Sequence, residues 1–337
     1  MKGHHRQKKT LLKVLAVILT VCSFLLTFRI AGLIDRFLDK PKTYLDDDYA
    51  YQIGGRPQYL VNGKWYAQKN DVETFLLIGI DKYEAAIPDE NGFRNRQQSD
   101  AVFLIAIDQK NREYSILQIN RDTMLNIRML DVSGTPYNDF QGQLALSHTF
   151  GSGKEDSCEN TVWSVSDYLY GLEIDHYLSL SMDAIKVMND KLGGVTVTVL
   201  DDMTVVDKAL VKDAKVTLHG DQALAYIRAR GELADSSNLE RMKRQRQYVS
   251  AFIERAKNVL TGNTELAYDL LLSVSGYMVS DLSAQELLSF SDLLDGYTYN
   301  GIRTIEGEAR KGGSFMEFYA DESALQSLIL SMFYDQK

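Results

Sequence analysis

The sequence predicts an α/β domain over roughly residues 70–337, and three observations support this fold class. Continuous apolar runs of strand length occur at 75–80, 101–107 and 114–119. Such runs suit strands buried on both faces, as in a layered α/β structure. Segments with helical spacing of apolar residues follow them, so strands and helices alternate along the chain. The composition is that of a globular protein, because 45% of the 337 residues are apolar and 25% are charged.

The N-terminal region predicts a membrane anchor. Residues 1–10 form a basic tail, and residues 11–34 form a predominantly apolar stretch. As a helix this stretch is about 36 Å long, which is enough to cross a hydrocarbon core of about 30 Å. Because the positive charges precede the span, we expect the tail in the cytoplasm and the rest of the chain outside. A cleaved signal peptide is the alternative, although no A-x-A site follows the stretch.

Charge and cysteine content exclude several classes of function. The chain has a net charge of −9, and residues 1–29 hold six basic groups and no acid, so the remainder carries −15. We therefore expect no nucleic-acid partner, and the cytoplasmic tail is too short for a folded regulatory domain. The two cysteines, Cys22 and Cys158, exclude a disulfide framework. The spacing of cysteine and histidine indicates no zinc site.

Residues 35–70 form a polar, tyrosine-rich connection between the anchor and the domain at 71–337. Within it, Tyr59 to Tyr66 reads as a β-hairpin, because Asn62-Gly63 supplies the positive φ angles of a type I′ turn. We interpret this hairpin as a stalk or as a cover for a sheet edge.

Later segments complete the predicted domain. Apolar residues recur at helical spacing in 160–172 and 181–192, and two glycines then lead into a β-rich run at 196–199. A helix begins at Gly220-Asp221. Further helices are predicted at 239–260, 265–274, 284–295 and 324–333.

Acidic residues next to predicted strand ends are candidate metal ligands. Asp81 follows the first buried run, and Asp100 precedes the second. In α/β sheets, ligand-binding side chains collect just past the strand ends. One or two carboxylates together with substrate phosphates are a usual way to hold Mg²⁺. The alternative is that each aspartate is a turn or cap residue.

A set of arginines in this acidic body indicates an anion site. Arg121 ends the third apolar run, Arg96 lies in the loop before Asp100, and Arg228 and Arg230 follow a predicted helix. Arg241, Arg244 and Gln245 lie at i, i+3 and i+4 on one helix face. Converging guanidinium groups bind phosphate bidentately and indicate a multiply charged anion such as a pyrophosphate. A solvated basic helix face is the alternative. Asp122 is either a base or the ion-pair partner that orients Arg121.

These residues occur in the order of a known family. The anchor is followed by Leu77-Ile78-Gly79-Ile80-Asp81, Ser99-Asp100, Asn120-Arg121-Asp122 and Leu192-Gly193-Gly194-Val195. The series ends with 218–230, which contains Arg228-Ala229-Arg230, and with Arg241-Met242-Lys243-Arg244-Gln245. In this order the chain resembles the LytR-CpsA-Psr family of cell-envelope enzymes. The resemblance extends to about residue 258.

The resemblance implies a single α/β/α sandwich with a mixed central sheet and an apolar tunnel for a lipid tail. It implies a Mg²⁺-dependent phosphotransferase that moves a glycopolymer from a polyprenyl-pyrophosphate carrier to peptidoglycan, at the outer membrane face of a Gram-positive envelope. Asp81 and Asp100 match the metal carboxylates, and we expect Arg121 and Asp122 to be the catalytic residues. The pyrophosphate-binding set is matched by Arg96, Arg121, Arg228, Arg230, Arg241 and Gln245. Asp122 or Asp81 is the expected proton acceptor. The apolar residues of 160–192 and 249–294 are either tunnel lining or core.

Three positions depart from the family pattern. Gln98 stands where an arginine is usual, Ala145 where an asparagine is usual, and Asn238 where an acid is common. These departures suggest an alternative function, in which the protein binds the lipid carrier or a wall polymer without catalysing transfer.

Overall fold

The structure of the protein is a computed structural model, which describes residues 51–53, 56–83, 87–89, 92–230, 237–313 and 315–337. The predicted tail at 1–10, the predicted anchor at 11–34 and the first part of the predicted connection at 35–70 lie outside the described residues. Within the described ranges, no helix has the length and apolar character needed to cross a membrane.

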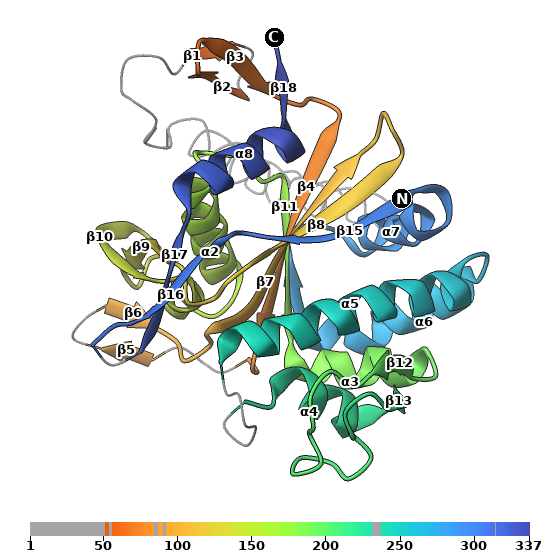
Figure 1. Cartoon of the computed structure of the whole chain (residues 1–337). Coiled ribbons are helices and arrows are strands. Elements are labelled where there is room, and N and C mark those ends of the chain that lie inside the picture. The colour runs from red at the N-terminus through yellow and green to blue at the C-terminus, as the bar shows by residue number, and fades with distance from the viewer. Residues whose placement is uncertain (1–50, 54–55, 84–86, 90–91, 231–236, 314) are drawn as a thin grey trace, which may run out of the picture. The chain divides into compact units, whose positions relative to one another are not determined.

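A mixed six-stranded sheet forms the centre of the domain (Figure 1). Its strand order is β14-β11-β4-β7-β8-β15. The bounds are Met278–Ser280 for β14, His176–Ser181 for β11, Val72–Ile80 for β4, Ser99–Asp108 for β7, Glu113–Ile119 for β8 and Thr298–Thr304 for β15. β11 is parallel to β4 and β15 is parallel to β8, whereas β7 is antiparallel to both of its neighbours. The predicted mixed central sheet is therefore confirmed.

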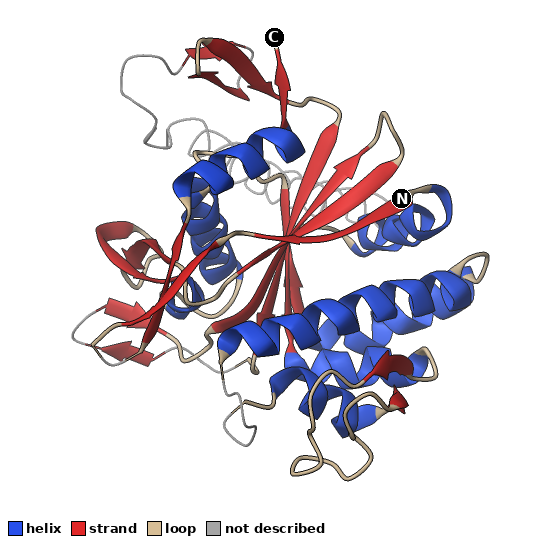
Figure 2. Cartoon of the chain, in the orientation of Figure 1, coloured by secondary structure: helices blue, strands red, loops and turns tan. Residues whose placement is uncertain are grey.

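Helices cover both faces of this sheet (Figure 2). One face carries α2 (Glu155–Tyr168) and α8 (Glu322–Phe333), which share a core with Leu76, Ile78 and Ile80 of β4. The opposite side holds α3 (Met182–Lys191), α4 (Gly220–Arg228), α5 (Asn238–Leu260), α6 (Thr264–Val274) and α7 (Ala284–Gly296). There, Phe75 of β4 packs with Ile253 of α5. Successive residues of β4 thus alternate between two cores, as a strand buried on both faces requires, and the predicted α/β/α sandwich is confirmed.

The helix predicted at 160–172 lies instead at 155–168. Its start is earlier because Glu155 and Asp156 occupy the first turn, where their charges favour the helix dipole. It ends earlier because Tyr170 and Gly171 adopt positive φ angles of 60° and 72°. Leu172 remains fully buried beyond this turn, so its apolar character extended the predicted helix past the true end.

The predicted hairpin is present and belongs to a second sheet. β2 (Arg56–Val61) pairs with β3 (Lys64–Gln68), and Asn62 and Gly63 have φ angles of 50° and 74°, as a type I′ turn requires. The sheet order is β1-β2-β3-β18, with β1 at Tyr51–Ile53 and β18 at Tyr334–Gln336. The last described strand therefore pairs with one of the first.

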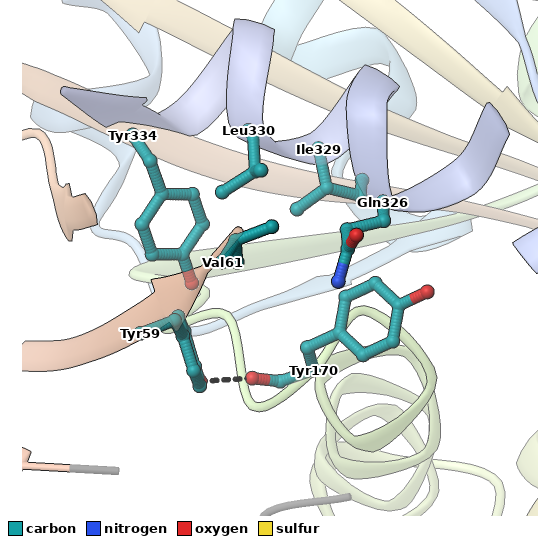
Figure 3. Close-up of a pocket in the computed structure, with 7 residues that line it drawn as sticks. All are labelled: Tyr59, Val61, Tyr170, Gln326, Ile329, Leu330 and Tyr334. Carbon is teal, nitrogen blue, oxygen red and sulfur yellow. Dashed lines mark hydrogen bonds between the residues drawn. The ribbon is translucent and has the colours of Figure 1, made fainter. Parts of the chain in front are cut away.

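This second sheet packs on the domain rather than standing apart from it. The Tyr59 hydroxyl donates a hydrogen bond to the backbone carbonyl of Tyr170 (Figure 3). Tyr59 and Tyr334 lie edge to face, with ring centroids 5.5 Å apart. The gap between the sheet and α8 is a cavity of only about 10 Å³, which is about the volume that one water needs. Tyr59, Val61 and Tyr66 thus share the core of the domain.

Shorter elements surround the central sheet. Four two-stranded ribbons pair β9 (Met124–Leu130) with β10 (Pro136–Gln143), β12 (Val195–Thr198) with β13 (Lys215–Leu218), β16 (Gly307–Lys311) with β17 (Met316–Ala320), and β5 (Ile87–Asp89) with β6 (Gly92–Arg94). Two 3₁₀ helices complete the chain, η1 (Leu144–Thr149) and η2 (Ser275–Tyr277).

The turn at Gly63 yields a test of the hairpin's contribution to stability. Gly63→Ala places a side chain at a left-handed φ of 74° with no atom within 4 Å, so its cost is conformational alone. We expect a loss of about 1 kcal/mol in the free energy of unfolding, measured by urea titration of the full chain in detergent micelles. The matched control is Gly276→Ala, which also has open space but an ordinary φ, and which should leave stability unchanged or raise it by up to about 1 kcal/mol. Equal effects of the two substitutions would contradict the turn assignment.

Candidate active site

The strand directions bring the predicted acids and the first arginine to one edge of the central sheet. Because β7 is antiparallel to β4 and β8, its beginning lies beside their ends: Ile80 pairs with Ser99, and Val102 pairs with Ile119. These pairings make neighbours of three residues at the adjoining ends of adjacent strands: Asp81, Asp100 and Arg121. The register of β4 and β7 shifts between Gly79 and Ile80, so Asp100 lies at an irregularity of the pairing at this edge.

Arg121 lies at the centre of this edge. Its Nη1 donates to Asp100 in a close ion pair, and its Nη2 donates to Oε1 of Gln98 at 2.6 Å. Its Nε lies 3.7 Å from Oδ1 of Asp122. Arg121 and Asp100 are both mostly buried, so solvent screens their attraction little. Gln98 and Asp100, around the beginning of β7, fix the guanidinium group together with Asp122, the next residue in the chain.

Arg241 reaches the same place from the first turns of α5. Its Nε and Nη2 both donate to Oδ1 of Asn238, at 3.1 and 2.6 Å, and its Nη1 lies 3.9 Å from Asp100. Asn238 in turn donates to Asn120 at 2.7 Å, which joins α5 to the end of β8. Burial lowers the pKa of Arg241 to about 10 despite the attraction of Asp100. The guanidinium is nevertheless protonated at neutral pH.

Asp122 is buried behind Arg121. Its Oδ1 accepts a hydrogen bond from Nε2 of Gln143 at 3.1 Å. Burial raises the pKa of the carboxyl group, although the charges of Arg121, Arg241 and Arg230 oppose this rise. A carboxylate that binds a proton more readily than usual is a better base at neutral pH.

A second ion pair borders the site. Nη2 of Arg228, at the end of α4, lies 2.7 Å from Oδ1 of Asp81, and both side chains are about half exposed. The backbone N–H of Met182 donates to the carbonyl of Asp81 at 3.2 Å, so the first turn of α3 positions this residue. Asp81 therefore presents its carboxylate at the solvent-accessible side of the edge.

A cavity of about 800 Å³ opens beside these residues. Its polar lining consists of Gln98, Asp100, Arg121, Asp221, Arg228, Arg230, Arg241 and Gln245. Its apolar lining consists of Met182, Val205, Val206, Leu224, Ala225, Ile227 and Ala229. The cavity combines four guanidinium groups with an apolar wall, and so suits an anion attached to an apolar chain.

The structure brings together most of the residues predicted from the sequence. Asp100, Arg121, Arg228, Arg230, Arg241 and Gln245 line the cavity. Asp81 and Asp122 adjoin it through their arginine partners. Arg96 does not line it, because this residue is exposed on the segment between β6 and β7.

Arg244 differs from the other two residues of its predicted group. It is fully buried, and its Nε donates to the carbonyl of Tyr226 at 3.1 Å, while Nη2 donates to that of Ala229. Its Nη1 lies 3.1 Å from Asp201. Arg241 and Gln245 face the cavity, whereas Arg244 holds the end of α4, from which Arg228 and Arg230 extend. Its contribution to the site is to support the backbone.

Several site residues were not predicted as such. Asn120 and Asn238 connect β8 to Arg241, and Gln143 contacts Asp122. Asn238 and Ala145, which lies two residues after Gln143, departed from the family pattern. These departures were the sequence signal by which Asn238 and Gln143 could have been found. Asn120 stood beside Arg121 and Asp122 in the matched series, but no role was assigned to it, because an asparagine after a strand is an ordinary turn residue.

Two carboxylates are available for a metal ion. In the part of the chain that the structure describes, no group of three or more His, Cys, Asp or Glu side chains forms a complete metal site. Asp81 and Asp100 supply oxygen ligands at the same sheet edge, next to the arginines of the cavity. This donor set fits Mg²⁺ held jointly by protein and substrate phosphate, since Mg²⁺ keeps few protein ligands.

Comparisons with known proteins find a matching family and relatives. The family model LytR_cpsA_psr matches residues 43–329. Biofilm regulatory protein A of Streptococcus mutans is 27% identical over 260 residues, which are 72% of this chain and 59% of that protein. The Bacillus subtilis polyisoprenyl-teichoic acid–peptidoglycan teichoic acid transferase TagV is 25% identical over 69% of this chain and 55% of its own length. The chain thus spans little more than half of each of these two relatives.

Solved structures share the fold. The structure of B. subtilis TagV has a TM-score of 0.60 at 22% identity, over 78% of this chain and 96% of that one. TagT bound to LI-WTA has a TM-score of 0.58 at 22% identity, over 78% and 90%.

The buried Asp122 generates a prediction about pH. The pKa of Asp122 is raised in the folded state, so ionisation of this carboxyl group lowers the free energy of unfolding. The loss is absent below the pKa of the unfolded state, about 3.9, and grows as the pH rises from there to the pKa of the folded state. Asp122→Asn removes the ionisation, so the variant should have the higher Tm at pH 8, with the difference narrowing toward pH 4. The exposed Asp335→Asn serves as control. A difference that is independent of pH would contradict the buried-carboxylate assignment.

Proposed function

This chain belongs to the LytR-CpsA-Psr family, and we propose that it is a phosphotransferase that moves a polyprenyl-pyrophosphate-linked glycopolymer onto peptidoglycan. The observation that carries the proposal is the pairing of four arginines with an apolar wall in one cavity of about 800 Å³. Relatives of the chain are named teichoic acid transferases, and a glycopolymer of the teichoic acid or capsular type is the donor proposed here.

The arginines match the charge of the proposed donor. A pyrophosphate presents several anionic oxygens, and Arg121, Arg228, Arg230 and Arg241 offer guanidinium groups around one space. Met182, Val206 and Leu224 would contact the first part of the polyprenyl chain. Binding at the arginines also withdraws electron density from the phosphorus atom that is attacked, which lowers the barrier to transfer.

The proposed reaction breaks the phosphoanhydride bond of the donor and forms a phosphodiester between glycan and acceptor. A hydroxyl oxygen of the acceptor sugar attacks the phosphorus next to the glycan and forms a new P–O bond. The bond between that phosphorus and the bridging oxygen breaks, and polyprenyl phosphate leaves. Asp122 accepts the hydroxyl proton, a role that suits its raised pKa. Arg121, 3.7 Å from Asp122, stabilises the charge that develops on the transferred phosphate.

Asp81 and Asp100 are the residues that would hold Mg²⁺. When bound, the ion would neutralise phosphate charge and polarise the leaving group. In the structure Asp81 pairs with Arg228, and Asp100 pairs with Arg121. The same carboxylates therefore orient two of the pyrophosphate-binding arginines.

The proposed location is the outer face of the cell membrane. The predicted anchor at 11–34 would hold the domain there, with the N-terminus inside, where the domain meets a lipid-linked donor and peptidoglycan. No nucleic-acid partner is proposed, given the acidic charge of the chain beyond residue 29.

A non-catalytic binding protein is the second candidate, because Gln98, Ala145 and Asn238 replace residues usual in the family. The contacts of these residues favour catalysis. Gln98 and Asn238 accept hydrogen bonds from Arg121 and Arg241, so both guanidinium groups keep a fixed orientation. Ala145 is buried, and its N–H donates to the carbonyl of Arg121 at 2.9 Å. The side chains at two of the three departures, Gln98 and Asn238, thus orient arginines of the site, whereas the hydrogen bond of Ala145 uses only its backbone.

Replacement of the central arginine tests the proposed reaction. The full chain in detergent micelles is incubated with a polyprenyl-pyrophosphate-linked saccharide, peptidoglycan and Mg²⁺, and the release of polyprenyl phosphate is followed. Arg121→Ala should lower the rate by about 10²–10³-fold, the usual effect of removing a donor that stabilises transition-state charge. The control is Arg303→Ala, an exposed arginine of β15, which should leave the rate unchanged. Tight donor binding by the wild type without turnover would favour the non-catalytic candidate.

Removal of the metal ion gives a separate prediction. Chelation by EDTA should stop transfer, and added Mg²⁺ should restore it. Asp100→Asn should raise the Mg²⁺ concentration needed for half-maximal rate, because one oxygen ligand loses its charge. The exposed Asp139→Asn should have the Mg²⁺ dependence of the wild type. Full activity in EDTA would remove Mg²⁺ from the proposed function.

A further inference from the structure

The β16–β17 ribbon joins the candidate site at Asp122. The N–H of Phe318 in β17 donates to the carbonyl of Asp122 at 2.8 Å. Gln143 donates from one nitrogen to the carbonyl of Met316 at 2.7 Å and to the carboxylate of Asp122 at 3.1 Å. Thr123 and Phe318 also form a parallel bridge. The ribbon, which Figure 1 shows running outward from the central sheet, is thus fixed directly to the proposed proton acceptor.

Alternation along β17 separates a buried face from an outer face. Thr123 and Phe318 are paired across the bridge, and both are buried. Residues that neighbour a paired position point to the opposite face of the strands. Glu317 and Tyr319 therefore point away from the face on which Phe318 is buried, on the strand that is hydrogen-bonded to the backbone of Asp122.

The outer face of the ribbon carries aromatic rings with polar groups fixed around them. Tyr319 is 39% exposed, and Phe315, at the ribbon's turn, is 59% exposed. The Tyr319 hydroxyl donates to Glu317 at 2.8 Å, and the guanidinium of Arg310 lies 5.2 Å from the ring centre. Arg310 is itself bound to Glu308 at 2.9 Å. Exposed rings offer a flat apolar surface, and the carboxylates beside them accept hydrogen bonds from hydroxyl groups.

A pyranose matches this chemistry, because one face of the sugar is a flat array of C–H groups and its rim carries hydroxyl groups. No residue of 307–313 or 315–320 lines the cavity assigned to the donor. The donor is held by the arginines of that cavity, whereas Asp122 has to contact the acceptor hydroxyl. A saccharide on the ribbon would therefore be on the acceptor's side of the reaction.

We propose that the outer face of β16–β17, built around Tyr319 and Phe315, binds the saccharide strand of the acceptor and directs its hydroxyl group to Asp122. This inference rests on the proposed function, because it assigns the acceptor of that same reaction to a surface.

Binding and kinetics of matched tyrosine variants test the assignment. The full chain in detergent micelles is sedimented with purified peptidoglycan sacculi, and transfer is measured over a range of acceptor and donor concentrations. Tyr319→Ala should weaken sacculus binding and raise the KM for acceptor on the order of tenfold. The KM for donor should stay unchanged. Tyr319→Phe keeps the ring and should retain most of the affinity.

Tyr268→Ala is the control, because Tyr268 lies on α6 with 56% exposure and should behave as the wild type. Equal sacculus binding by all variants would overturn the assignment. A change in the KM for donor in Tyr319→Ala would also overturn it, since the ribbon would then act on the donor. If the wild type shows no transfer but its sacculus binding is lost only in Tyr319→Ala, the proposed function fails while the saccharide surface stands.

Discussion

The antiparallel pairing of β7 with both β4 and β8 is the constraint on which the site depends. It places the beginning of one strand beside the ends of two others, so Asp81, Asp100 and Arg121 become neighbours without any long loop. Backbone hydrogen bonds of a buried sheet are among the most rigid contacts in a protein. Arg121 consequently has a defined position before any substrate arrives, and the helices of the opposite side supply the other arginines around it.

The site gathers like charges, and neutral amides make this possible. Arg121 and Arg241 are both mostly buried, where two positive charges repel each other strongly. Asp100 contacts both guanidinium groups, while Gln98 and Asn238 accept hydrogen bonds from them without adding negative charge. The amides fix the geometry of the guanidinium groups yet leave much of their positive charge available to an anion. An acid at either position would orient the same arginine and neutralise it.

The sequence was sufficient to predict the layers and part of the site. Buried strands and amphipathic helices leave apolar periodicity, so β4, β7, β8 and α5 were found close to their true bounds. Strand order was not predictable, because pairing joins residues far apart in the chain. Arg244 was grouped with Arg241 by helical spacing, although its buried partners are backbone carbonyls of α4. The β16–β17 ribbon escaped notice because β16 is exposed along its whole length and has no apolar alternation.

The pairing of β18 with β3 has a consequence for how the chain folds. Residues Tyr334–Gln336 lie against Tyr66–Gln68, and Phe333 is buried in the core shared with β4. Contacts between such distant segments carry a high loop-closure entropy and form slowly. The edge beside β3 has no partner until Tyr334–Gln336 have been synthesised. Folding of this domain therefore cannot be completed before these residues are available, and a chain that lacks them exposes a strand edge to its neighbours.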